Sequence, residues 1–156
     1  MSYKIHIQSG NISKIENSTV TSVTEQVPGL TYGTLTGSEI TYTPEDGSTW
    51  VVYDTQFTCH SRNSAHVGIY SVLTYEESGT ESAFEYRFTG DGYNDGGYLI
   101  RYKFLIPSYT GSRIWRLKTQ YHYGTSWSQD FHEDEDGNQY FPITTMYSIT
   151  VSYTHL

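Results

Sequence analysis

The sequence predicts an all-β domain, and its composition and its hydrophobic pattern both lead to this. Of the 156 residues, 16 are Tyr and 14 are Gly. Thr is also abundant, whereas Ala occurs at two positions and Leu at seven. Tyr and Thr favour sheets, while Ala and Leu are the strongest helix formers. Apolar and polar residues alternate in segments that turn residues separate. We therefore expect one β-sandwich or barrel.

The expected strands follow one another from residue 39 onward. Residues 39–43 form a short strand that stops at the turn residues Pro44 and Gly47. Residues 49–60 alternate most strictly, which puts one set of side chains on a shared face and predicts them in the core. This set is Val51, Tyr53, Phe57 and Cys59. Six more alternating segments are residues 66–76, 81–89, 97–106, 113–123, 126–132 and 145–154. In residues 113–123, Trp115 and Leu117 share a face and are also predicted in the core.

Residues 1–37 differ from the rest of the chain. Tyr3, Ile5 and Ile7 alternate with polar residues, but residues 9–36 are rich in Ser, Thr, Gly and Asn and poor in large apolar side chains. Such a segment has too little apolar surface to build its own core. We expect residues 1–37 to be an extended N-terminal arm that orders against another molecule or a neighbouring subunit, and residues 38–156 to be the sandwich.

Residues 37–57, Gly-Ser-Glu-Ile-Thr-Tyr-Thr-Pro-Glu-Asp-Gly-Ser-Thr-Trp-Val-Val-Tyr-Asp-Thr-Gln-Phe, carry a resemblance. They are similar to virion proteins of phages of marine cyanobacteria and related hosts, which share Gly-Ser-x-Ile-x-Tyr-Thr-Pro-x-x-Gly-Ser/Thr-x-x-Val-x-Tyr-x-x-x-Phe. The resemblance implies a jelly-roll β-sandwich of the tumour-necrosis-factor-like type and a homotrimer. It also implies a place on the outer surface of a phage particle, after synthesis in the host cytoplasm.

The basic residues gather in two neighbouring strand segments. By alternation Arg101 and Lys103 share one strand face, and Arg116 and Lys118 share one face of the next segment. If the two segments pair as a hairpin, their outer face carries one basic patch on a molecule whose formal net charge is -8. We expect this patch, together with Tyr3, Ile5 and Ile7, to dock on an acidic neighbouring subunit. Ordinary solubility charge on an exposed strand face is the alternative.

The charge and the motifs exclude several classes of function. An acidic chain does not displace the counterions of nucleic acid, and no apolar run is long enough to span a bilayer. Cys59 and His60 are adjacent in a strand, so they point to opposite faces and form no catalytic pair. No pair of carboxylates and no nucleophile turn stands out. We expect no enzymatic activity and no cofactor.

No metal site is expected either. The spacing of His60, His66, His122 and His132 matches no compact zinc pattern. Residues 91–96 begin like a calcium loop, but an EF-hand requires Glu at its twelfth position and the chain has Tyr102 there. The acidic residues 133–138 form a solvated loop, or alternatively gather a calcium ion.

A capsid decoration (cement) protein that works as a homotrimer is the first functional hypothesis. In it, the arm of residues 1–37 contacts the capsid shell or a neighbouring protomer. Tyr and Trp are common at interfaces, and the 16% aromatic content exceeds what one small core holds, so several Tyr are expected at the contacts between copies. Tyr ladders on exposed strand faces and a sugar-binding platform are the alternatives for these aromatic residues. The partners would then be further copies of the chain and the major capsid protein or another virion protein. The alternative is a receptor-binding tip of a fibre that holds a host-surface glycan. A glycan-cleaving enzyme is a third hypothesis, with no acid pair to support it.

Overall fold

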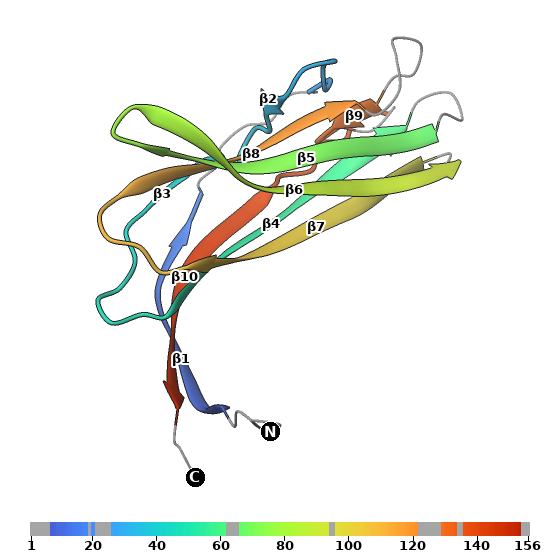
Figure 1. The fold of residues 1–156 in the computed structure, drawn as a ribbon. Helices are drawn as coiled ribbons and strands as arrows, with labels where there is room; N and C mark the ends of the chain where they lie inside the picture. The colour runs from blue at the N-terminus through green and yellow to red at the C-terminus, as the bar shows by residue number, and fades with distance from the viewer. Residues whose placement is uncertain are drawn as a thin grey trace, which may run out of the picture.

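The computed structural model describes residues 7–18, 20, 26–61, 66–93, 96–121, 129–133 and 136–153. This part of the chain contains β-strands and no helix. Figure 1 shows them as two layers with the chain passing from one layer to the other. The strands are β1 (Ile7–Asn17), β2 (Gly33–Thr34), β3 (Ile40–Tyr42), β4 (Trp50–Ser61), β5 (His66–Glu77), β6 (Thr80–Tyr93), β7 (Gly96–Pro107), β8 (Arg113–Tyr121), β9 (Gln129–Phe131) and β10 (Ile143–Tyr153). The predicted all-β class is confirmed.

The strands form two antiparallel sheets with the order of a jelly roll. Sheet A has the order β1-β10-β4-β7, with β9 also beside β4, and sheet B has the order β2-β8-β5-β6, with β3 also beside β8. Long connections therefore carry the chain from one sheet to the other, as two Greek keys require. The predicted β-sandwich is thus confirmed, and its strand order is that of the jelly roll that the resemblance implied.

The inner faces of the two sheets make one core. All six residues that the sequence predicts in the core are at most 1% exposed: Val51, Tyr53, Phe57, Cys59, Trp115 and Leu117. Rings from both sheets are buried in it, Phe57 and Phe131 from sheet A and Trp115 from sheet B, and Phe57 lies edge-on to Phe131 at 5.4 Å between centroids. The buried hydroxyl of Tyr53 donates to the carbonyl of Ser38 at 2.6 Å, so its polar atom is satisfied.

The N-terminal part of the chain belongs to the sandwich, which corrects the expectation of a separate arm. Strand β1 pairs with β10 from Asn17↔Thr145 to Ile7↔Tyr153, and Leu35 is fully buried in the core. Backbone hydrogen bonds to β10 hold β1, so it does not need the apolar side chains that the sequence lacks there. Tyr3 and Ile5 lie outside the described residues, and Ile7 is described for its backbone alone.

Strands β1 and β10 continue beyond the sheet. The pairing of β10 with β4 ends at Ile149↔Trp50, whereas its pairing with β1 runs on to Ile7↔Tyr153. Residues 150–153 and their partners therefore form a two-stranded ribbon that leaves the sandwich (Figure 1), and its last described pair is Ile7↔Tyr153. A two-stranded ribbon alone is marginally stable in water.

Candidate interaction surfaces

The predicted basic patch does not exist as one surface. Strand β7 lies in sheet A and β8 in sheet B, so the two strands do not form the expected hairpin. The connection after Pro107 carries the chain across the sandwich instead, as the jelly-roll order demands. Arg101 and Lys103 consequently lie on the outer face of sheet A, and Arg116 and Lys118 on the outer face of sheet B.

On sheet A, the two cations share one carboxylate. Arg101 donates from Nε and Nη2 to the two oxygens of Asp54 at 2.9 and 2.7 Å, and the Lys103 ammonium lies 3.1 Å from Oδ2. The hydrogen bond from Arg101, more than that from Lys103, holds the pKa of Asp54 below its usual range. The Asp54 side chain is 13% exposed, while Arg101 and Lys103 are 59% and 53% exposed. This part of the face therefore shows positive charge to solvent.

The remainder of this outer face, toward the ribbon, is apolar across all four strands. One cross-strand row joins Ile12, Ile149, Trp50 and Pro107. The next row joins Tyr147, Val52 and Leu105. Val52 points outward yet is 3% exposed, because its neighbours close over it, while Ile12 and Leu105 are more than half exposed. We call these seven residues the apolar face of sheet A.

The sequence contains a signal for this face that the alternation pattern hides. Val51 and Val52 are adjacent in β4, and Phe104, Leu105 and Ile106 are consecutive in β7. Adjacent strand residues point to opposite sides, so apolar neighbours mean that both sides of the strand are apolar. The inward apolar residues fill the core, and the outward ones form the apolar face of sheet A.

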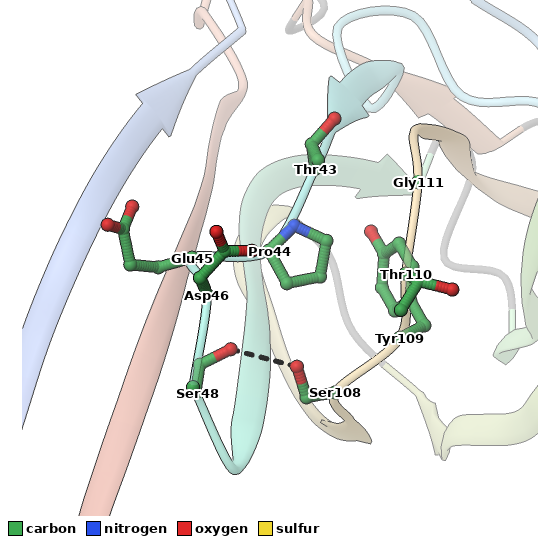
Figure 2. A pocket seen from close by; sticks show the side chains of 10 residues that line it. Thr43, Pro44, Glu45, Asp46, Ser48, Ser108, Tyr109, Thr110 and Gly111 are labelled. Carbon is green, nitrogen blue, oxygen red and sulfur yellow. Dashed lines mark hydrogen bonds between the residues drawn. The ribbon is translucent and has the colours of Figure 1, made fainter.

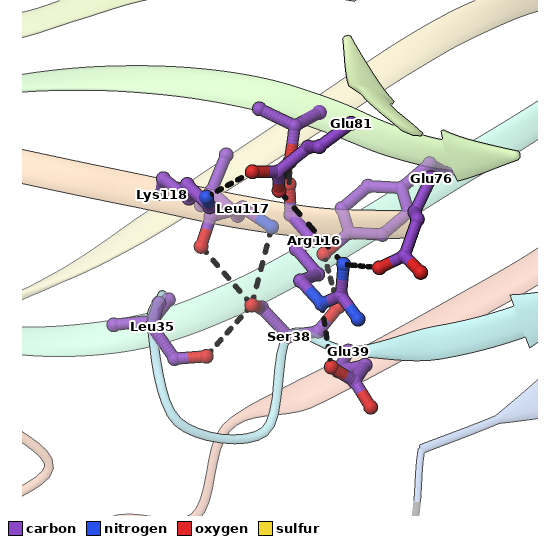
Figure 3. Close-up of polar contacts among 10 residues, drawn as sticks. Leu35, Ser38, Glu39, Glu76, Glu81, Arg116, Leu117 and Lys118 are labelled. Carbon is purple, nitrogen blue, oxygen red and sulfur yellow. Dashed lines mark hydrogen bonds and ion pairs between the residues drawn. The ribbon is translucent and has the colours of Figure 1, made fainter. Parts of the chain in front are cut away.

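On sheet B the carboxylates cover the cations (Figure 3). Arg116 donates to Glu39 at 2.6 Å and to Glu76 at 2.7 Å, and Lys118 pairs with Glu81. The hydrogen bond from Lys118 is the largest cause of the lowered pKa of Glu81. Arg116 and Lys118 are 17% and 22% exposed, whereas Glu39 is 57% exposed. Because carboxylates shield them, Arg116 and Lys118 present little positive charge to a partner.

A buried serine holds Glu39 in place for this network. The Ser38 hydroxyl donates to the Leu35 carbonyl at 2.7 Å and accepts from the Leu117 backbone N–H at 3.2 Å. Figure 3 shows this hydroxyl at the centre of the contacts that fix the turn before β3 to β8. The turn also contains Gly37 at φ 78°, where an added Cβ would lie 2.4 Å from Pro142. The turn therefore requires glycine.

The same face of sheet B carries a group of aromatic side chains, Tyr32, Tyr70, Tyr86 and Phe88, which we call the aromatic platform. Tyr70 lies opposite Phe88 in the register, with ring centroids 5.0 Å apart, and Tyr32 meets Tyr86 edge-on at 6.2 Å. Burial, and then the nearby hydroxyls of Tyr86 and Tyr70, raise the pKa of Tyr32. The four rings thus form two contacting pairs.

A β-bulge creates the platform. The register of β5 and β6 shifts between Leu73↔Glu85 and Thr74↔Ala83, which leaves Phe84 as the extra residue. Phe84 packs against Trp115 in the core. From the bulge onward the alternation is reset, so Tyr86 and Phe88 point outward although they follow Phe84 at a spacing of two. The sequence gives no sign of this change.

A pocket of about 360 Å³ lies at one end of the sandwich between residues 43–48 and 108–111 (Figure 2). The hydroxyls of Ser48 and Ser108 bond to each other across it at 2.8 Å. Tyr109 accepts from Trp115 Nε1 at 2.7 Å and donates to the Tyr42 carbonyl at 3.0 Å. The residues that line the pocket include no His, Cys, Lys or Arg.

The histidines whose side chains the structure describes do not form a metal site. Within the described part of the chain, no three His, Cys, Asp or Glu side chains form a group that could hold a metal ion. His60 stacks on Tyr140 at 5.5 Å between ring centroids. The His66 side chain and His122 lie outside the described residues, as do residues 134–135 of the acidic segment 133–138. The same described part contains no helix long and apolar enough to cross a membrane.

His132 is the exceptional titratable group. It is fully buried with a left-handed φ of 69°, and neither ring nitrogen has a hydrogen-bond partner among the described residues. Its backbone connects the loop after β9 to β4 and to residue 140, because its N–H donates to the Thr58 carbonyl and its carbonyl accepts from the Tyr140 N–H. Burial lowers the pKa of His132 from 6.5 to about 4.

No family model and no curated protein matches the chain. Among solved structures, the chain is similar to a protein of infectious bursal disease virus strain Gx, with a TM-score of 0.42 and 13% identity over 94% of this chain and 38% of that one. It is also similar to the VP2 subviral particle of infectious bursal disease virus, with a TM-score of 0.43 and 10% identity over 95% of this chain and 43% of that one. The chain spans about two fifths of the length of both proteins.

Proposed function

We propose that this protein is a virion structural protein, specifically a capsid decoration (cement) protein that binds the outside of a phage head shell as a homotrimer. Two observations from independent sources support it. Residues 37–57 resemble phage virion proteins, and the sandwich keeps an apolar face where a solitary domain has a polar one. The apolar face carries the proposal, because an apolar outer surface is suited to contact another protein.

An outer sheet face that is apolar over four strands is unusual for a domain in water. Outward positions of a two-sheet sandwich are ordinarily polar, and a contiguous exposed apolar patch marks a surface that another molecule covers. Here Leu105, Trp50 and Ile149 lie in two adjacent rows of the apolar face. A cement protein acts by burying such area across the seams between shell subunits, which raises the cost of separating them.

The neighbouring charges indicate what the partner surface looks like. Arg101 and Lys103 border the apolar face and are more than half exposed. A partner with an apolar centre and an acidic rim would complement them. The major capsid protein or another virion protein would be this partner, and further copies of the chain would complete the trimer. The net charge of -8 argues against nucleic acid.

Copy number in the particle tests the proposal. Particles of the virus whose genome encodes the chain would be purified, and the abundance of the chain relative to the major capsid protein would be measured by quantitative mass spectrometry. Hundreds of copies on the outer surface would agree with a decoration protein. Absence from the particle would overturn the structural role, and a few dozen copies or fewer would favour a tail or fibre location.

A matched pair of variants tests the surface. Leu105 and Leu99 both point outward from β7 and are similarly exposed, but Leu99 lies on the far side of the Arg101 and Lys103 row. We expect Leu105→Glu to abolish incorporation into particles and Leu99→Glu to reduce it far less. Equal incorporation of both variants would show that the apolar face does not dock.

A receptor-binding tip on a tail or head fibre is the second candidate. The specific observation in its favour is the aromatic platform of sheet B, because Tyr86 is largely exposed although it is a large ring. A low copy number together with adsorption of the purified protein to host cells would select this candidate.

A further inference from the structure

The platform lies on the side of the sandwich opposite the apolar face, since the two sheets pack through their inner faces. When sheet A docks on a shell, sheet B faces away from the particle. A ligand of the platform would therefore come from outside. This orientation rests on the proposed function, while the binding chemistry below depends only on the side chains of sheet B.

The platform combines exposed aromatic rings with polar neighbours in the register. Tyr86 and Phe88 are 65% and 46% exposed. In the register, Gln120 lies beside Tyr70, and Lys118 lies between Val72 and Thr34. Rings with hydroxyls, an amide and a threonine beside them suit a ligand that has an apolar side and a hydroxyl-bearing rim.

Size argues against a protein as the occupant. A specific protein interface takes about 800 Å² from each partner, or roughly 20–30 residues a side, while the platform has four aromatic side chains. A larger footprint on this face would have to cover Glu39, Glu76 and Glu81 with their two cations. Burying that network removes its hydration, and the desolvation penalty can exceed the Coulombic gain.

The charges around the platform favour a neutral ligand over an anionic one. The two outward cations of β8, Lys118 and Arg116, already bind Glu81, Glu76 and Glu39, and the most exposed of these five groups is a carboxylate. An anionic ligand would find no available cation in this network and would meet like charge. A neutral ligand meets neither problem.

We infer that the outer face of sheet B binds a neutral saccharide, with the C–H face of a sugar ring stacked on Tyr86 and Phe88. Its hydroxyls then hydrogen-bond to the phenol groups and to Gln120. Sialic and uronic acids are disfavoured by Glu39 and Glu81.

An oligosaccharide array tests the inference. The full chain is applied to immobilised neutral oligosaccharides of hexose and N-acetylhexosamine and, on the same array, to sialylated and uronic-acid oligosaccharides. We expect binding to members of the neutral set. For the strongest neutral binder, Kd is then measured for the unaltered chain, Tyr86→Ala, Phe88→Ala and the control Phe141→Ala, which removes an equally exposed ring outside the platform.

Tyr86→Ala and Phe88→Ala should each weaken binding about tenfold, with Phe141→Ala unchanged and with Tm the same for all three. Binding to no neutral saccharide, preference for the acidic set, or equal loss in Phe141→Ala would each overturn the inference. Particle copy number is measured separately. Hundreds of copies without saccharide binding would refute this inference alone, and saccharide binding by a protein absent from virions would refute the proposed function alone.

Discussion

The outer faces of sheets A and B have the same plan and opposite chemistry. Each is apolar at one part and charged at another. On sheet A the apolar part is mainly aliphatic, and two exposed cations cover Asp54. On sheet B the apolar part is aromatic, and carboxylates cover Arg116 and Lys118. One chain with a net charge of -8 thus offers two surfaces of different sign.

This difference teaches that the position of a charge in the sequence does not decide what it shows to a partner. Lys103 and Lys118 are both lysines on outward strand positions beside an ion-pair partner. Lys103 remains exposed because its carboxylate is the buried member of the pair. Lys118 is shielded because β5, β6 and the turn before β3 together supply three glutamates to Arg116 and Lys118. This difference in exposed charge is why we propose different partners for the two faces.

The largest expected effect comes from removing the core that both faces share. Trp115 is fully buried on the inner side of sheet B. Trp115→Ala should lower the free energy of unfolding by about 3–5 kcal/mol, and both faces should lose binding together. Urea denaturation measures this, with Tyr86→Ala as an exposed aromatic control. Loss of one face while the other still binds would show that the sheets are not one cooperative unit.

Acid should destabilise the fold that carries both faces, because it protonates His132, which belongs to neither face. Its pKa is about 4 in the folded protein against 6.5 for the usual group, so between these values the unfolded chain binds a proton that the folded chain does not. The contribution of His132 to the free energy of unfolding is therefore fully present above about pH 6.5. It falls by about 3 kcal/mol as the pH drops to about 4.

Denaturation curves from pH 7 to pH 4 measure this loss, with His132→Asn as the comparison. Asparagine tolerates the left-handed backbone and does not titrate, so its curve should be flatter over this range. A parallel loss in both proteins would assign the acid sensitivity to other groups.

A matched pair of charge deletions should separate the two faces directly. Arg116→Met leaves Glu39 and Glu76 beside each other without their cation and should cost about 1–3 kcal/mol of stability. Lys103→Met removes an exposed cation while Arg101 still binds Asp54, so it should cost less than about 0.5 kcal/mol. Thermal denaturation of both variants checks this, and equal costs would remove the distinction between covered and exposed cations.

The smallest effects belong to the surfaces themselves. Leu105→Ser and Tyr86→Ser should each change the free energy of unfolding by less than about 0.5 kcal/mol, because both side chains are largely in solvent. Urea denaturation of each variant checks this. A cost above about 1.5 kcal/mol for either variant would mean that the residue supports the fold, so that its effect on binding is indirect.

Alternation predicted the core well, because strands such as β4 place Val51, Tyr53 and Phe57 on one side without interruption. The surfaces were harder to predict from the sequence, since they depend on which strands lie side by side in each sheet. That β7 and β8 lie in different sheets follows from topology, which alternation does not contain. The extra residue at Phe84 reverses the side of β6 that faces solvent, and no local pattern marks it.

The N-terminal strand illustrates a different limit. Residues 11–17 are mostly exposed and contribute backbone pairing to β10, so their polar composition is compatible with a strand at the edge of a sheet. Leu35 is buried as a single apolar residue among polar neighbours. Neither feature has the periodicity by which a core segment is recognised.

The ribbon of β1 and β10 makes the sandwich suitable for circular permutation. Since Ile7 lies opposite Tyr153, the chain enters and leaves the fold at one place, which is the geometry that tolerates insertion into a longer polypeptide or circular permutation. A linker could join these two positions, and the tight turn at Ser78 and Gly79 between β5 and β6 offers a new opening. A permuted protein would keep both faces while its new ends emerged at that turn.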